Sequence, residues 1–359
     1  MVKSRWLRSL LKLGTLLQPA KPRRRSKAVK AVKPGKAAKP IRSKTTTATA
    51  AARTALPRAA PAAAGKWLAA HYLADGVPMR RMAYWLYLPE AAPRPEGMPL
   101  LVMLHGCEQS ATEFAQGTRM NRLAGDQGYA VLYPQQALRA HPQRCWKWYD
   151  RATQQGGGDA ALIAGVIAQV RSRYPIDARR MYIAGMSSGA GMAHIVALNQ
   201  PGLFAGLGLH SSPSFGAGHG MAGALAVMQH GAALRTGPAI AALQARHPAF
   251  PALPTMLVQG MDDAVVRPVN QAQLAQQALM LNGLAPPALG PAQHHAATQR
   301  THAYQLRDAQ RQRQLLLRVL SIDGLGHAWS GGDASLPYNS ARGPDASRML
   351  LAFFKRQRR

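Results

Sequence analysis

The hydrophobic positions of the chain fall into short unbroken apolar runs and longer stretches with helical spacing. Unbroken runs such as residues 99–104 and 129–134 are typical of strands buried on both faces of a sheet. Strands that alternate with amphipathic helices predict an α/β fold, with a mostly parallel central sheet and helices on both faces. The predicted strands are residues 84–89, 99–104, 129–134, 181–184, 255–259 and 315–320, and the predicted helices are residues 118–127, 159–174, 190–198 and 347–354.

The pattern assigns this folded domain to residues 66–359. Two segments within it, residues 217–250 and 284–313, are rich in Ala, Gln and His and show no periodicity that assigns them to an element.

The first 65 residues have a different composition. They carry 17 Lys and Arg and no acid, whereas the rest of the chain has 28 basic and 15 acidic residues. Residues 19–64 have almost no large apolar side chains, which predicts a disordered tail because little surface is available for burial. Residues 3–17 combine Leu and Trp with basic side chains, and this predicts a short basic amphipathic helix. The tail would bind polyanions or be a solvated spacer without a partner.

The chain has only two cysteines, Cys107 and Cys145, which are too few for a four-cysteine zinc site. They are therefore either free thiols or a single disulfide. No stretch approaches the ~20 consecutive apolar residues of a transmembrane helix.

A glycine-flanked serine carries the clearest chemical signal. Gly185-Met186-Ser187-Ser188-Gly189 follows a predicted strand and precedes a predicted helix. In that context the G-x-S-x-G pattern forms a sharp turn that presents the serine as a nucleophile. An ordinary turn serine is the alternative, so the partners of Ser187 decide between the two.

An acid and a histidine follow in the chain order that this motif requires. Asp262 and Asp263 lie just after the predicted strand 255–259, and from the local pattern either could orient a histidine. His327 lies in the glycine-rich segment after the strand 315–320, in a loop rather than on an apolar face.

Stabilising the oxyanion requires two backbone N–H groups near the nucleophile. One is expected from Ser188, directly after Ser187. The other is expected from Cys107, because Gly106 allows a tight turn after the strand 99–104.

Five segments together resemble the polyhydroxybutyrate depolymerase family of esterases, which includes short-chain polyhydroxyalkanoate depolymerases and feruloyl and acetylxylan esterases. The resemblance covers residues 66–359, and the matching segments are residues 104–109, 145–148, 185–189, 260–270 and 326–332. It implies the α/β-hydrolase fold.

The resemblance also implies roles for individual residues. Ser187 would be the nucleophile, His327 the general base and Asp263, by the family's spacing, the acid. It further implies a disulfide between Cys107 and Cys145. The chain departs from the family at Lys147, where Asn is common between two tryptophans.

The expected function is that of a serine esterase that forms an acyl-enzyme without a metal or organic cofactor. The expected substrate is poly(3-hydroxybutyrate) or its oligomers. The alternatives are a feruloyl or acetyl esterase on small or carbohydrate esters and, in a different class, a polyanion-binding protein. The expected substrate contacts, with buried core residues as an equal alternative for the tryptophans, are His105, Trp146, Trp148 and Trp329.

The expectations for localisation conflict. A basic N-terminus without a clear cleavage site favours the cytoplasm, beside storage granules, with the tail on a granule, anionic membrane or nucleic acid. The implied disulfide favours secretion into an oxidising compartment, as for many family members. The sequence makes no prediction about oligomeric state.

Overall fold

The structure is a computed structural model that describes residues 63–74 and 80–359. The predicted basic tail and its helix at residues 3–17 lie outside the described residues, apart from the last residues before the domain.

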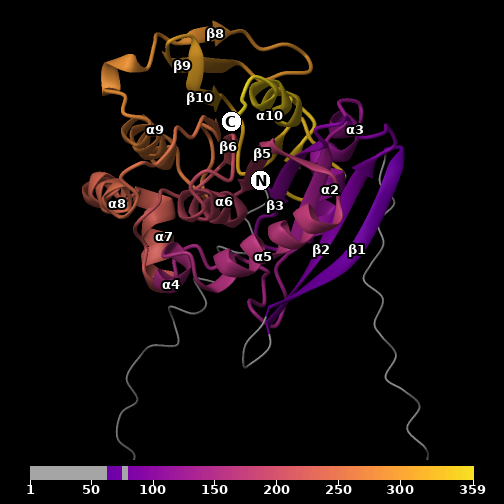
Figure 1. The fold of residues 1–359 in the computed structure, drawn as a ribbon. Helices are drawn as coiled ribbons and strands as arrows, with labels where there is room; N and C mark the ends of the chain where they lie inside the picture. The colour runs from indigo at the N-terminus through magenta and orange to yellow at the C-terminus, as the bar shows by residue number, and fades with distance from the viewer. Residues whose placement is uncertain (1–62, 75–79) are drawn as a thin grey trace, which may run out of the picture. The chain divides into compact units, whose positions relative to one another are not determined.

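A large mixed sheet forms the centre of the fold (Figure 1). Its order is β1-β2-β4-β3-β5-β6-β7-β10-β9-β8, and the six strands from β4 to β10 run parallel. Two antiparallel strands flank this parallel centre on each side. The strands are β1 (Gly65–Ala74), β2 (Arg80–Pro89), β3 (Met98–Leu104), β4 (Ala130–Gln135), β5 (Ile176–Met186), β6 (Gly206–His210), β7 (Thr255–Gly260), β8 (Gln293–His295), β9 (Tyr304–Arg311) and β10 (Gln314–Ile322).

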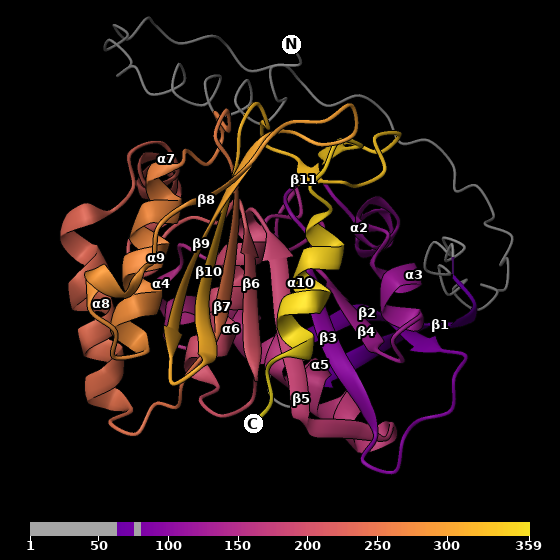
Figure 2. The ribbon, with the colours of Figure 1, turned by 90° about the horizontal axis from the view of Figure 1, so that it is seen from above.

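Helices cover both faces of the sheet. In Figure 2, α10 and α3 lie on one face, and α5 and α6 lie on the other. The helices are α2 (Ala111–Thr118), α3 (Met120–Gly125), α4 (Arg151–Gln154), α5 (Gly158–Arg173), α6 (Ser188–Asn199), α7 (Gly220–His230), α8 (Ala233–Arg246), α9 (Val269–Leu281) and α10 (Ala346–Lys355), with a 3-10 turn η1 (Pro286–Ala288) and a small bridge between β11 (Trp329–Ser330) and β12 (Asn339–Ser340). The predicted α/β architecture with a mostly parallel sheet is confirmed.

Five of the six parallel strands, β4, β3, β5, β7 and β10, form where the apolar runs predicted them. Strands β3 and β7 are buried along their whole length. Two strands had no such signal. Strand β1 has many exposed positions, and β6 is a five-residue segment with two glycines. The unassigned segments contain α7 and α8 in one case and η1, β8 and β9 in the other.

The helix predicted over residues 118–127 is wrong in its extent. Arg119 adopts a left-handed conformation with φ of 54°, which ends α2 and begins α3. Helix α2 begins earlier, at a capping box in which Ser110 accepts from the Glu113 amide and the Glu113 carboxylate accepts from the Ser110 amide.

The parallel centre brings loops from distant parts of the sequence to one edge. The carboxyl ends of parallel strands meet at the same edge of a sheet, where α/β proteins place their ligands. The segments that follow β3, β5, β7 and β10 therefore share an edge, and they contain every residue predicted for the nucleophile, acid, base and oxyanion donors.

Candidate active site

Ser187 lies on the turn between β5 and α6. Its backbone has φ of 55° and ψ of −124°, a conformation that non-glycine residues rarely adopt. This is the strained strand-to-helix turn that G-x-S-x-G sequences form. The Ser187 amide donates to the carbonyl of His210 at the end of β6, at 2.9 Å, which ties the turn to the neighbouring strand.

Glycines flank Ser187 because the turn leaves no room for side chains. A Cβ atom on Gly185 would lie 2.5 Å from the carbonyl carbon of Gly189. A Cβ atom on Gly189 would lie 2.2 Å from the carbonyl oxygen of Leu104, at the end of β3. The two glycines let α6 begin directly against the strand that leads into the predicted oxyanion loop.

Asp263 and His327 form a hydrogen-bonded pair. Nδ1 of His327 lies 2.8 Å from Oδ2 of Asp263, whose side chain is fully buried. Asp262 instead has an exposed side chain, and its amide donates to the carbonyl of Leu325. Of the two aspartates left open by the local pattern, the structure therefore brings Asp263 to the histidine.

Hydrogen bonds occupy both oxygens of the Asp263 carboxylate. Oδ1 accepts from the amides of Val265 and Val266 at 2.9 Å, and Oδ2 also accepts from Nε2 of Gln259 at 3.2 Å. Burial acts to raise the pKa of Asp263, but His327 and the two amides outweigh it and hold the pKa below its ordinary value. The carboxylate is therefore charged and has a fixed orientation.

The loop after β3 contacts the nucleophile turn. A Cβ atom on Gly106 would lie 3.5 Å from Cβ of Ser187. The Gly106 amide donates to Oε1 of Gln109 at 2.8 Å, whereas the amides of Cys107 and Ser188 have no acceptor among the described residues. Oγ of Ser188 also lies 3.3 Å from Sγ of Cys107. The two predicted oxyanion donors thus lie on adjacent turns.

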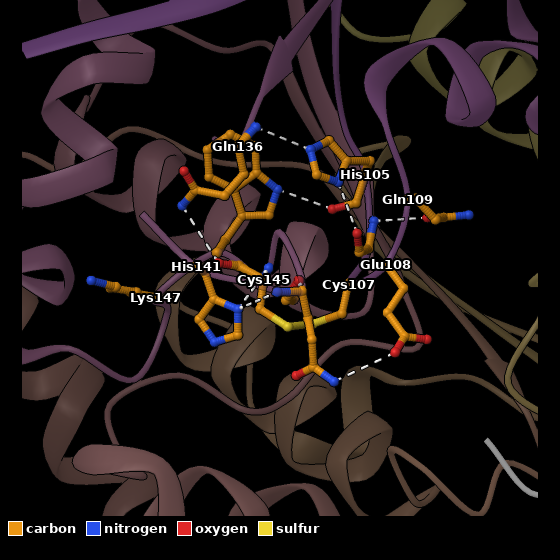
Figure 3. The surroundings of a disulfide bond; sticks show 12 residues. His105, Cys107, Glu108, Gln109, Gln136, His141, Cys145 and Lys147 are labelled. Carbon is orange, nitrogen blue, oxygen red and sulfur yellow. Dashed lines mark hydrogen bonds between the residues drawn. A yellow bond between two sulfur atoms is a disulfide. The ribbon is translucent and has the colours of Figure 1, made fainter. Parts of the chain in front are cut away.

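A disulfide joins Cys107 to Cys145, as Figure 3 shows. It links the loop after β3 to the segment before α4. The indole N–H of Trp146 donates to the carbonyl of His105 at 3.0 Å and fixes the same loop from the same segment. Lys147, the departure from the family pattern, is exposed between two buried tryptophans.

The structure places His105, which was predicted to contact substrate, in the interior of the protein. Its side chain has no exposed surface. Nε2 accepts from the Gln136 amide at 3.1 Å, so Nδ1 carries the proton and donates to the Gly106 carbonyl at 2.8 Å. Burial lowers the pKa of His105 to about 4, which keeps the ring neutral. His105 therefore supports the loop after β3 from the interior of the protein.

The three tryptophans predicted as substrate walls are also interior residues. Trp146, Trp148 and Trp329 are buried in the structure. The indole N–H of Trp329 donates to Oγ of Ser347 on α10, at 3.1 Å. Their apolar area packs against the protein, so the alternative of buried core residues is the one that the structure supports.

Comparison with known proteins adds to this geometry. The model of the Esterase PHB depolymerase family matches residues 82–300, which is more than half of the chain and includes Ser187 and Asp263. The chain belongs to this family. His327 lies beyond the matched residues, on the loop after β10.

Curated relatives match over shorter stretches. The poly(3-hydroxybutyrate) depolymerase of Ralstonia pickettii is 30% identical over 166 residues, which cover 43% of this chain and 34% of that protein. The acetylxylan esterase A of Emericella nidulans is 31% identical over 127 residues, covering 34% of this chain and 40% of that protein. The chain thus spans about a third of the length of the family members that it matches.

A solved structure shares the fold. The acetyl xylan esterase from Aspergillus awamori superposes with a TM-score of 0.62 over 77% of this chain and 94% of that one, at 18% sequence identity. This places the described domain in the α/β-hydrolase fold, as the family resemblance implied.

Sequence reasoning missed two residues near the Asp263–His327 pair. Gln259 is a buried amide at the end of β7 and donates to Asp263. His210 is a buried histidine at the end of β6. In each case the signal was a polar residue at the carboxyl end of an otherwise apolar strand. For His210 it went unused because β6 was not predicted.

Proposed function

We propose that the protein is a serine esterase with Ser187 as nucleophile, His327 as general base and Asp263 as the residue that orients His327. The observation that carries the proposal is the 2.8 Å contact between Asp263 and His327, at the sheet edge that also holds the strained turn of Ser187. A buried carboxylate bonded to Nδ1 leaves Nε2 of the imidazole to accept a proton from a serine hydroxyl.

The proposed reaction is acyl transfer in two steps. Ser187 Oγ attacks the ester carbonyl carbon while His327 takes its proton, and the amides of Cys107 and Ser188 stabilise the oxyanion. The protonated His327 then gives its proton to the departing alcohol, which leaves an acyl-enzyme. His327 then takes a proton from water as the water oxygen attacks the acyl carbon, and it gives that proton to Ser187 Oγ as the acyl–oxygen bond breaks, which releases the acid and restores the serine hydroxyl and the neutral imidazole.

The proposed substrate is poly(3-hydroxybutyrate) or its oligomers, with feruloyl or acetyl esters of small molecules or carbohydrates as the alternative. Membership of the Esterase PHB depolymerase family supports both, because the matched relatives carry names of both kinds. Turnover of hydroxybutyrate oligomers, feruloyl esters and acetylated sugars, compared at equal enzyme concentration, distinguishes the two. A preference for the acetylated sugars would contradict the first choice.

The Ser187→Ala variant tests the nucleophile. Turnover of a short-chain p-nitrophenyl ester should fall on the order of 10⁵- to 10⁶-fold, because no other group supplies the attacking oxygen. Circular dichroism should remain that of the folded protein. Ser172→Ala, on the exposed surface of α5, is the control and should retain full activity. Substantial turnover by Ser187→Ala would place the nucleophile elsewhere.

We also infer that the protein functions in an oxidising compartment. The Cys107–Cys145 disulfide supports secretion over the cytoplasmic expectation, because cytosolic thiols are kept reduced. No described helix combines the length and apolar character needed to cross a bilayer. Thiol labelling in native extracts tests the inference. Labelling of Cys107 and Cys145 without prior reduction would contradict it.

A further inference from the structure

His210 ends β6, the strand between β5, which leads into Ser187, and β7, which leads into Asp263. Its side chain has no exposed surface, and it has no part in the reaction as proposed above. Burying a polar ring costs free energy unless its nitrogens are hydrogen-bonded. The partners of His210 therefore indicate what the residue does.

The backbone of His210 holds the nucleophile turn, and its ring holds the loop that follows His327. Its carbonyl accepts the amide N–H of Ser187 at 2.9 Å. Its Nε2 accepts the amide N–H of Ser330 at 3.3 Å. Nδ1 therefore carries the proton and donates to Oγ of Ser211 at 3.1 Å.

The ring also fixes Trp329, two residues after His327. His210 and Trp329 stack with 4.9 Å between ring centroids and 23° between planes. Phe114 of α2 packs edge-on against Trp329, at 5.5 Å and 88°. Trp329 is thus held between β6 and α2, and this fixes the start of the loop that continues from His327.

We propose that His210 is a positioning residue for the esterase reaction, which sets the separation between Ser187 and His327 by bonding to both of their segments. This inference rests on the proposed function. A nucleophile and its base must be placed to within a fraction of an ångström, because a misplacement of about 1 Å costs on the order of 10²-fold in rate. His210 is well placed for this task because one residue bonds to the nucleophile turn through its backbone and to the base-bearing loop through its side chain.

The neutral form of His210 suits this position. Burial lowers the pKa of His210 to about 3; the charge of His327 acts in the same direction and that of Asp263 in the opposite one. A neutral ring keeps Nε2 free to accept from Ser330. It also adds no positive charge beside His327 when that residue becomes an imidazolium during the reaction.

Two variants at His210 and one control test the proposal. His210→Phe keeps a ring that stacks on Trp329 but removes both nitrogens and leaves the buried Ser330 amide without an acceptor. His210→Gln carries an oxygen at about the reach of Nε2 and restores that acceptor. His194→Phe makes the same substitution at another buried histidine, on α6, whose Nδ1 has no partner in the described structure.

The readout is kcat and KM for a short-chain p-nitrophenyl ester, with folding checked by thermal unfolding. We expect His210→Phe to lower kcat about 10²-fold, with KM changed by less than about twofold. We expect His210→Gln to recover most of kcat and His194→Phe to keep it. Three results would overturn the proposal: retained kcat in His210→Phe, an equal loss in His194→Phe, or no recovery in His210→Gln.

If His210→Phe does not fold, His210→Asn replaces it, because the shorter amide does not reach Ser330; kcat should then be lost in Asn and kept in Gln. Wild-type turnover and its loss in Ser187→Ala are measured in parallel. If the wild-type protein does not turn over the ester, or if turnover persists in Ser187→Ala, the proposed function itself is refuted. If the wild-type protein is active and Ser187→Ala is not, the variants at His210 test the positioning role alone.

Discussion

Asp263 shows how a single side chain can be fixed by its neighbours. The carboxylate accepts four hydrogen bonds, two from backbone amides and two from Gln259 and His327. These bonds favour the charged form against the cost of burial. They also prevent the carboxylate from rotating, so that His327 is held with Nδ1 toward Asp263.

The Asp263→Asn variant should therefore lose activity while keeping its shape. An amide at this position can donate to Nδ1, which would place the imidazole proton on Nε2 and leave no base for Ser187. The expected loss in turnover is on the order of 10³- to 10⁴-fold. Steady-state kinetics measures it, and Asp126→Asn controls for the removal of an exposed carboxylate. Activity within tenfold of wild type would contradict the role of Asp263.

The same variant should change how stability depends on pH. The folded state holds the pKa of Asp263 below its ordinary value of 3.8, so folding weakens proton binding at this group. The stabilisation is therefore fully present above pH 3.8 and is lost as the pH falls through the folded-state pKa. Urea unfolding at a series of pH values should show the gap between wild type and Asp263→Asn narrowing on acidification below about pH 4. If the stability difference between the two proteins instead widens on acidification, folding does not lower the pKa of Asp263.

Residue roles could be predicted from the sequence where chemistry and chain order restrict the choice, and not where burial decides. Ser187 and His327 have glycine neighbours and positions after strands, and both are local signals. The local sequence around Trp146 and Trp329 would look the same whether the two side chains line a cleft or fill a core. The fold places them in the core. The role of His105 could not be predicted either, because its hydrogen-bond partner Gln136 follows a different strand.

At the scale of elements, apolar runs predicted the central strands because burial on both faces leaves no other pattern. The same reasoning failed for β6, whose two glycines shorten the run, and for α7, where Ala gives little contrast between faces. It failed for α8 because Pro238 lies inside that helix, where proline argues against helical structure. The break between α2 and α3 was also not predicted, because the left-handed backbone conformation of Arg119 does not change the hydrophobic pattern.

The disulfide acts on one element, the loop after β3. Replacing both cysteines by serine should destabilise the protein by about 2–4 kcal/mol, because the crosslink spans a separation of 38 residues. Turnover should also fall, by up to about 10²-fold if the Cys107 amide leaves its place. Denaturant unfolding and kinetics measure the two effects.

Reducing agent on the wild-type protein should reproduce both effects, and on the Cys107→Ser/Cys145→Ser variant it should have none. Unchanged stability after complete reduction, confirmed by labelling two thiols, would mean that the loop is held by Trp146 and His105 alone.

At the scale of the whole molecule, charge is divided unequally along the chain. The first 65 residues carry 17 of the 45 Lys and Arg residues and none of the 15 acids. The site at the edge of the sheet draws no residue from this segment, since its parts follow β3, β5, β6, β7 and β10. We therefore expect catalysis and polyanion binding to be separable.

A variant that lacks residues 1–62 should keep its esterase activity and lose most of its affinity for double-stranded DNA or anionic vesicles. The full chain should bind both, with affinity falling steeply between 50 and 200 mM salt, typically 10³- to 10⁵-fold for six to ten phosphate contacts. Fluorescence anisotropy and vesicle sedimentation measure binding.

A full-length variant with the 17 tail cations replaced by Gln separates the effect of charge from that of chain length. If that variant binds as tightly as wild type, the 28 basic residues of the rest of the chain hold the polyanion. If truncation abolishes turnover in a folded protein, the segment belongs to the enzyme, because a spacer or polyanion anchor would leave kcat unchanged.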